Sequence, residues 1–203
     1  MQYIANDKSE RLKNLLNTSF DLFLKQLVAG KITINKESSM QLHYSNLIHR
    51  LGDIICIEPR EIFNIELESA YEKKNIDITC GYDDVKAAIE LKCFRKKSNR
   101  PMDIDMYDVL KDIERLYSYH GFAIKKFICI TDDNRYSAAN HTGHAGSVNI
   151  GNGVIYKKDF DIEPSWIDKW KDKSRDRAII FPNDVVFNWD KLGDWYFLNI
   201  DLI

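Results

Sequence analysis

Apolar residues recur at helical spacing over the first fifty residues. Over 8–29 they return every three or four positions, and Gly30 follows at the expected stop. A second stripe predicts a helix that begins after Asn35 and ends at Gly52, with Gly52 as the left-handed residue past its end. The N-terminal quarter of the chain is therefore expected to be helical.

The pattern changes to strand spacing after this region. Segments 63–71, 75–82 and 86–94 alternate or run apolar over strand lengths, and short turn-like stretches separate them. These segments predict a meander of three antiparallel strands.

A third helical pattern follows the meander. Pro101 precedes a segment with acidic residues in its first turns and an apolar stripe behind them, which predicts a helix over 103–119. The apolar run 127–130 then reads as a central strand buried on both faces. A helix between two strands favours a crossover to a parallel neighbour.

The last third of the chain mixes a long loop with short strands. Residues 134–153 are rich in Asn, Gly, Ser and His and are expected to form the loop. Segments 185–189 and 195–203 flank a turn-like stretch and predict a C-terminal hairpin. The whole pattern predicts an α/β fold.

Composition places the chain among ordinary folded proteins. It has 203 residues, 44% of them hydrophobic, and a formal charge of −2, so one domain is expected, with a helical part at 8–52, a core at 60–135 and C-terminal strands at 147–203. Neither an apolar run of membrane-spanning length nor a signal-peptide core is visible, and a cytoplasmic location without membrane contact is expected. The near-neutral charge excludes a broadly basic nucleic-acid coat protein.

The four cysteines do not form a metal-binding pattern. Cys56, Cys80, Cys93 and Cys129 are widely spaced, without a C-x-x-C pair. Each lies in an apolar context, where a free thiol behaves as a small buried hydrophobe.

Charged residues interrupt the apolar character of two meander strands. In the segment IELKCF, alternation sends Glu90 and Lys92 to one face. Asp77 interrupts the preceding strand between two isoleucines, and pairing through the short turn brings Asp77, Glu90 and Lys92 together. Two carboxylates with a neighbouring ammonium suit a Mg²⁺ ion, which retains water and phosphate as its other ligands. The lysine can orient or deprotonate an attacking water, or neutralise developing negative charge.

The order of Asp77, the triplet Glu90-Leu91-Lys92, a basic segment and a helix resembles the PD-(D/E)xK nuclease superfamily, which includes many type II restriction endonucleases. The resemblance covers about residues 35–135 and departs from the family name at Ile76, where the motif has proline. It implies a restriction-endonuclease-like fold with a mixed central β-sheet flanked by α-helices. It also implies that Asp77 and Glu90 bind the metal and that Lys92 is catalytic.

The resemblance further implies one upstream acid, for which three candidates exist. Glu37 lies on the second predicted helix, one turn before Gln41. Glu66 and Glu68 share one face of the first meander strand if alternation holds. Glu37 and Glu68 are favoured as assisting catalytic residues, and Glu66 stays an alternative.

A basic segment follows the triplet. Its four positive charges fall within six residues without an acid among them, and they are Arg95, Lys96, Lys97 and Arg100. Such a cluster beside a metal site suits contact with the phosphate backbone of DNA. The alternative is a solvated loop that balances the acidic helix after it.

Together these features predict a Mg²⁺-dependent endodeoxyribonuclease, with Mn²⁺ as a substitute, of the type II restriction or defence kind. A homodimer is expected, because a symmetric dimer matches the two strands of a palindrome. Two alternatives stay open. One is a catalytically inactive nuclease-fold module for binding or assembly, and the other is a nuclease that acts on RNA or branched DNA.

Overall fold

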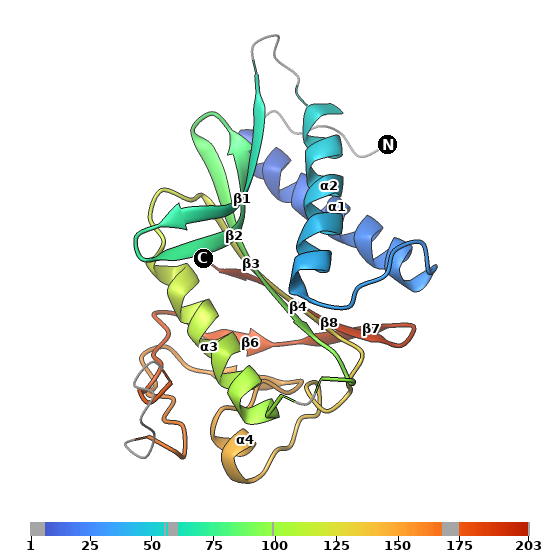
Figure 1. The fold of residues 1–203 in the computed structure, drawn as a ribbon. Coiled ribbons are helices and arrows are strands. Elements are labelled where there is room, and N and C mark those ends of the chain that lie inside the picture. The colour runs from blue at the N-terminus through green and yellow to red at the C-terminus, as the bar shows by residue number, and fades with distance from the viewer. Residues whose placement is uncertain (1–6, 55, 57–60, 99, 168–174, 203) are drawn as a thin grey trace. The chain divides into compact units, whose positions relative to one another are not determined.

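Figure 1 shows the computed structural model of the chain, which describes residues 7–54, 56, 61–98, 100–167 and 175–202. The helices in this part of the chain are α1 (Lys8–Val28), α2 (Glu37–Ile54), α3 (Met102–Ser118) and α4 (Gly143–Ser147). The strands are β1 (Phe63–Tyr71), β2 (Lys74–Tyr82), β3 (Val85–Phe94), β4 (Ile124–Thr131), β5 (Val154–Tyr156), β6 (Val185–Phe187), β7 (Trp189–Leu192) and β8 (Trp195–Leu202).

Six strands form one sheet in the order β1-β2-β3-β4-β8-β7, and β5 pairs with β6 in a separate sheet. The six-stranded sheet is mixed and is flanked by helices. Its first three strands form the expected antiparallel meander. Strand β3 neighbours β4, and α3 lies between them in the sequence. The prediction of an α/β fold with a mixed, helix-flanked sheet is confirmed at this level.

The chain divides into two compact units. The first consists of Met1–Leu91 with Tyr119–Lys126, and the second of Lys92–Ser118 with Phe127–Ile203. Strands β3 and β4 each contribute residues to both units. The expected organisation as one domain stays a prediction. Among the described residues, no helix has the length and apolarity required to cross a membrane.

In the first unit, an aromatic cluster joins α1 to α2. Asp7 caps the N-terminus of α1, and its carboxylate accepts a hydrogen bond from the backbone N–H of Glu10. The rings of Phe20 and Phe23 each lie 5.9 Å from that of Tyr44 in edge-on contacts. The buried Tyr44 hydroxyl donates to the carbonyl of Leu16 at 3.2 Å, so α1 and α2 pack with a satisfied polar group at their centre.

In the second unit, α3 buries the apolar stripe that the sequence predicted. The stripe residues that are fully buried are Met106, Val109, Leu110, Ile113 and Leu116. The Tyr107 ring on this helix contacts Trp166 edge-on at 5.8 Å. The indole N–H of Trp166 donates to the carbonyl of Arg175 at 2.8 Å. This packing explains why the segment adopts a helix.

Two sequence expectations differ from the structure. Gly52 does not end α2 but lies inside it, buried, where an added Cβ would come within 2.2 Å of the Phe63 ring. The glycine is therefore required for close packing of α2 on β1. The segment 185–189 is not one strand, because residues 185–187 form β6, which pairs with β5, and Trp189 begins β7. The C-terminal hairpin is formed by β7 and β8.

The loop matches its expectation, whereas the prediction of buried cysteines is confirmed for two of the four and wrong for the other two. The segment 134–153 is irregular apart from α4 and isolated turns. Cys80 and Cys129 are buried, whereas Cys56 and Cys93 are partly exposed. Burial raises the pKa of the Cys80 thiol to about 12, so this thiol remains protonated at neutral pH.

Candidate active site

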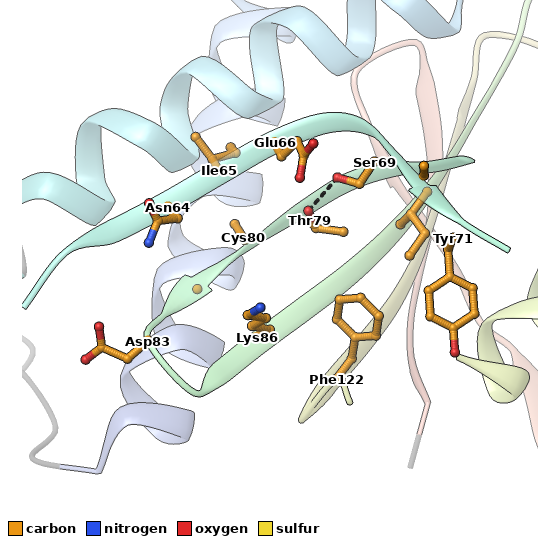
Figure 2. A pocket seen from close by; sticks show the side chains of 13 residues that line it. Asn64, Ile65, Glu66, Ser69, Tyr71, Thr79, Cys80, Asp83, Lys86 and Phe122 are labelled. Atoms are coloured by element: carbon orange, nitrogen blue, oxygen red, sulfur yellow. Dashed lines mark hydrogen bonds between the residues drawn. The ribbon is translucent and has the colours of Figure 1, made fainter. Parts of the chain in front are cut away.

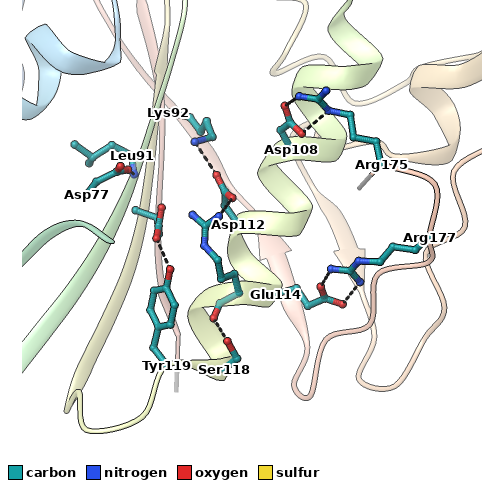
Figure 3. A network of polar contacts seen from close by, with 12 residues as sticks. Asp77, Leu91, Lys92, Asp108, Asp112, Glu114, Ser118, Tyr119, Arg175 and Arg177 are labelled. Atoms are coloured by element: carbon teal, nitrogen blue, oxygen red, sulfur yellow. Dashed lines mark hydrogen bonds and ion pairs between the residues drawn. The ribbon is translucent and has the colours of Figure 1, made fainter. Parts of the chain in front are cut away.

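Asp77 lies where the backbone ladder between β2 and β3 ends. The ladder runs from Tyr82 opposite Val85 to Ile78 opposite Ile89. Asp77 is the next residue of β2, and its Oδ2 accepts a hydrogen bond from the backbone N–H of Leu91 at 2.6 Å (Figure 3). Leu91 is the middle residue of the triplet Glu90-Leu91-Lys92, so this bond joins Asp77 to the backbone of β3 between Glu90 and Lys92. The expected convergence of the three charged side chains stays a prediction.

Glu90 is held in a buried position on β3. Its side chain is 1% exposed, and its Oε1 accepts a hydrogen bond from the Tyr119 hydroxyl at 2.8 Å. Tyr119 follows α3 in the sequence and is itself buried. Because burying a carboxylate is costly without polar partners, the Tyr119 hydroxyl stabilises Glu90 and limits its orientations. The sequence analysis did not identify Tyr119, which is 29 residues from Glu90.

Lys92 continues the same strand and forms an ion pair in the second unit. Its Nζ lies 2.6 Å from Oδ2 of Asp112 on α3 (Figure 3). The other oxygen of Asp112 lies 2.9 Å from a guanidinium nitrogen of Arg115. The Lys92 and Asp112 side chains are only 16% and 9% exposed, so water screens this pair weakly. Asp112 therefore fixes the position of the Lys92 ammonium group, a role that the sequence did not indicate.

Glu68, one of the candidate upstream acids, approaches Asp77 through Gln41. Gln41 Nε2, on α2, donates to Glu68 Oε1 at 3.0 Å and to the main-chain oxygen of Asp77 at 2.7 Å. Glu68 has a φ of 53°, which lies in the left-handed region and interrupts the alternation of β1. Glu66 instead lines a cavity, so the two acids do not share a face as expected.

Glu37, the other favoured acid, lies in the first turn of α2. It precedes Gln41 by one helical turn, and residues at this spacing share a helix face. Its side chain is partly exposed. Gln41 contacts Asp77 from this helix, and the role of Glu37 as an assisting acid stays a prediction.

The predicted DNA-binding residues differ in how far they engage other side chains. Arg95 donates two hydrogen bonds to Asp132 Oδ2, at 2.9 and 3.1 Å, and its guanidinium lies over the Trp195 ring. Arg100 lies 2.8 Å from Asp105. The Lys96 and Lys97 side chains are exposed. The two arginines therefore stabilise the second unit, while the two lysines extend into solvent.

The hydrogen bonds to Asp132 also affect its ionisation. Burial alone raises the pKa of the Asp132 carboxyl. Hydrogen bonds from Arg95 and from the backbone N–H of Lys96 outweigh this effect, and the pKa lies below its ordinary value. Asp132 is consequently ionised at neutral pH and holds the start of the basic segment in place.

The donor set of Asp77 and Glu90 fits a hard divalent cation. Mg²⁺ binds through one or two carboxylates and keeps several water molecules. Over the described ranges, no three or more His, Cys, Asp or Glu side chains are grouped as a metal site. A site with Asp77 and Glu90 as its protein ligands would match this smaller requirement of Mg²⁺.

Comparisons with known proteins add no relative. No protein-family model, curated protein or solved structure matches the chain. The functional argument therefore depends on the residues and contacts described above.

Proposed function

We propose that the protein is a Mg²⁺-dependent endodeoxyribonuclease with a restriction-endonuclease-like fold. The observation that supports this most directly is the hydrogen bond from the Leu91 N–H to Asp77 Oδ2. It joins the acid of β2 to a strand whose next residues on either side are Glu90 and Lys92. Asp77 is thus bonded to the residue that separates Glu90 from Lys92 in the sequence.

Each residue has a distinct role in this proposal. Asp77 and Glu90 hold the metal, and Glu68 or Glu37 assists from the side of Gln41. A bound Mg²⁺ supplies positive charge that activates water and stabilises charge on the phosphorus centre. Lys92 orients the attacking water or neutralises developing charge, and Asp112 keeps its ammonium group in place.

The basic segment completes the proposed substrate contact. Lys96 and Lys97 contact the DNA backbone through their exposed side chains, and Arg95 and Arg100 contribute charge from their ion pairs. A homodimer, a cytoplasmic location and a restriction or defence role belong to the same proposal.

One alternative comes from another functional class. The 2.6 Å ion pair between Lys92 and Asp112 would also suit a module for binding or assembly, in which these charges are structural. Such a module would not require a metal ion. A nuclease that acts on RNA or branched DNA would share the same residues and differ in substrate.

A digestion experiment tests the proposal. We expect the wild-type protein to cut plasmid DNA with Mg²⁺ or Mn²⁺ and to lose activity with EDTA. Asp77→Asn and Glu90→Gln should each reduce the rate by more than about 100-fold, since even groups behind metal ligands are worth about 10- to 100-fold. Asp21→Asn, an exposed acid on α1, is the matched control and should cut normally.

Two results would contradict the proposal. One is cleavage at the wild-type rate by a folded Asp77→Asn protein, which would show that another site acts. The other combines two observations. The protein cuts no nucleic acid, and its Mg²⁺ affinity, measured by calorimetry, is the same in Asp77→Asn as in the wild type. The latter result would favour the binding module.

A further inference from the structure

A cavity of about 490 Å³ lies in the first unit, on the meander of β1, β2 and β3 (Figure 2). Ser69 and Thr79 line it, and their hydroxyl groups are 2.7 Å apart. Phe122 and Tyr71 add aromatic surface. The volume is within the range of pockets that bind small organic groups.

The cavity adjoins the candidate metal ligands at two points. Ile76 lines it and is the residue before Asp77. On the other side, the Tyr71 ring lies 4.6 Å from the ring of Tyr119, whose hydroxyl donates to Glu90. Ile76 therefore separates the cavity from Asp77 along β2, and Tyr71 and Tyr119 separate it from Glu90.

The charges of the lining do not favour a phosphate group. Glu66 and Asp83 contribute two carboxylates, and Lys86 contributes one ammonium. The Asp83 charge is compensated by Lys8, whose Nζ lies 3.1 Å away, which leaves one acid and one base. Anion sites instead gather cations or backbone N–H groups. A flat, neutral group with hydrogen-bonding edges is the better match.

We propose that this cavity receives an unpaired base of the DNA substrate beside the scissile phosphate. Phe122 supplies a face for stacking, and the Ser69 and Thr79 hydroxyls, with Glu66, supply hydrogen-bonding groups for the base edge. The inference depends on the proposed nuclease function and specifies its substrate as DNA with an unstacked base near the cut.

The experiment compares oligonucleotides that carry an abasic site at each position around the cut. Wild-type protein with Mg²⁺ should show a KM about tenfold higher when the missing base is the one beside the scissile phosphate, because stacking on an aromatic side chain is worth about that factor. Single-stranded or mismatched DNA should be cut with a lower KM than perfect duplex.

Variants of Phe122 test whether the cavity is the binding site of the base. Phe122→Ala, with Phe122→Leu as a milder change, should raise KM for intact DNA about tenfold and leave KM for the abasic substrate unchanged. Phe160→Ala is the matched control, since Phe160 is exposed and does not line the cavity. It should match the wild-type protein on every substrate.

The possible failures are distinguishable. If no nucleic acid is cut, or if Asp77→Asn cuts normally, the nuclease proposal fails. If DNA is cut in an Asp77-dependent way but no abasic position changes the KM of the wild-type protein, the nuclease proposal stands and the base-binding cavity is wrong. That comparison uses only wild-type protein, so it does not depend on whether the variants fold.

Discussion

At the scale of single residues, the structure shows how one buried acid is kept in place. Glu90 is almost fully buried and accepts a hydrogen bond from Tyr119. A side chain that binds a cation benefits from a fixed orientation, because it would otherwise lose conformational entropy when the cation binds. Tyr119 is therefore a positioning residue for Glu90.

Tyr119→Phe tests this role by the removal of one hydroxyl group. We expect Mn²⁺ affinity, measured by calorimetry, to fall about tenfold, with the ring packing against Tyr71 retained. Tyr156→Phe is the control, because its hydroxyl bonds only the Asn149 carbonyl among the contacts described. Equal metal affinity in both variants would show that Tyr119 has a purely structural role.

The candidate acids and the lysine stand out in the sequence, but the side chains that contact them do not. Asp77, Glu90 and Lys92 are visible because charge interrupts apolar strands. Gln41, Asp112 and Tyr119 belong to helices or their ends and contact the site through chain separations that no local pattern encodes. Strand alternation predicts that Glu66 and Glu68 share a face. It cannot predict the left-handed conformation of Glu68, which separates the two side chains.

At the scale of elements, the contact of α2 with β1 depends on a missing side chain. Most helices gain stability when glycine is replaced by alanine, by about 1 kcal/mol. At Gly52 the new Cβ would collide with the Phe63 ring. The sequence suggested a helix end here because glycine commonly ends helices, whereas the structure uses its small size for packing.

We therefore expect Gly52→Ala to lower the free energy of unfolding by about 1–3 kcal/mol, the usual cost of overpacking. Urea denaturation followed by circular dichroism measures this change. The double variant Gly52→Ala/Phe63→Leu should recover part of the loss, because the smaller side chain makes room for the Cβ. A Gly52→Ala protein more stable than wild type would show that helix propensity outweighs the clash.

At the scale of the whole molecule, the net charge of −2 is a sum of opposed local groups. Arg95 and Arg100 are paired with acids of the second unit, which reduces the positive charge that remains for DNA. The two carboxylates of the proposed metal site, Asp77 and Glu90, would repel phosphate until a cation is bound. DNA affinity should therefore be weak without a divalent ion and stronger with one.

Fluorescence anisotropy with labelled DNA measures this behaviour. In the Asp77-intact protein, Ca²⁺ or Mn²⁺ should tighten binding, and EDTA should reverse it. Lys96→Ala/Lys97→Ala should remove about two phosphate contacts. The slope of log affinity against log salt concentration should become shallower by about 0.9 for each contact. The exposed pair Lys31→Ala/Lys36→Ala is the control. Strong, metal-independent binding would contradict the charge argument.

The hydrogen bond between Asp77 and Leu91 has a consequence for how this position can change. The Asp77 carboxylate takes the place of a backbone hydrogen-bond acceptor where the pairing of β2 with β3 ends. It therefore holds the two strands together there and also contributes negative charge. Asparagine retains an oxygen for the fastening but loses the charge, and alanine loses both. Evolutionary change at position 77 is therefore restrained by the stability of the fold, even in a chain without catalytic activity.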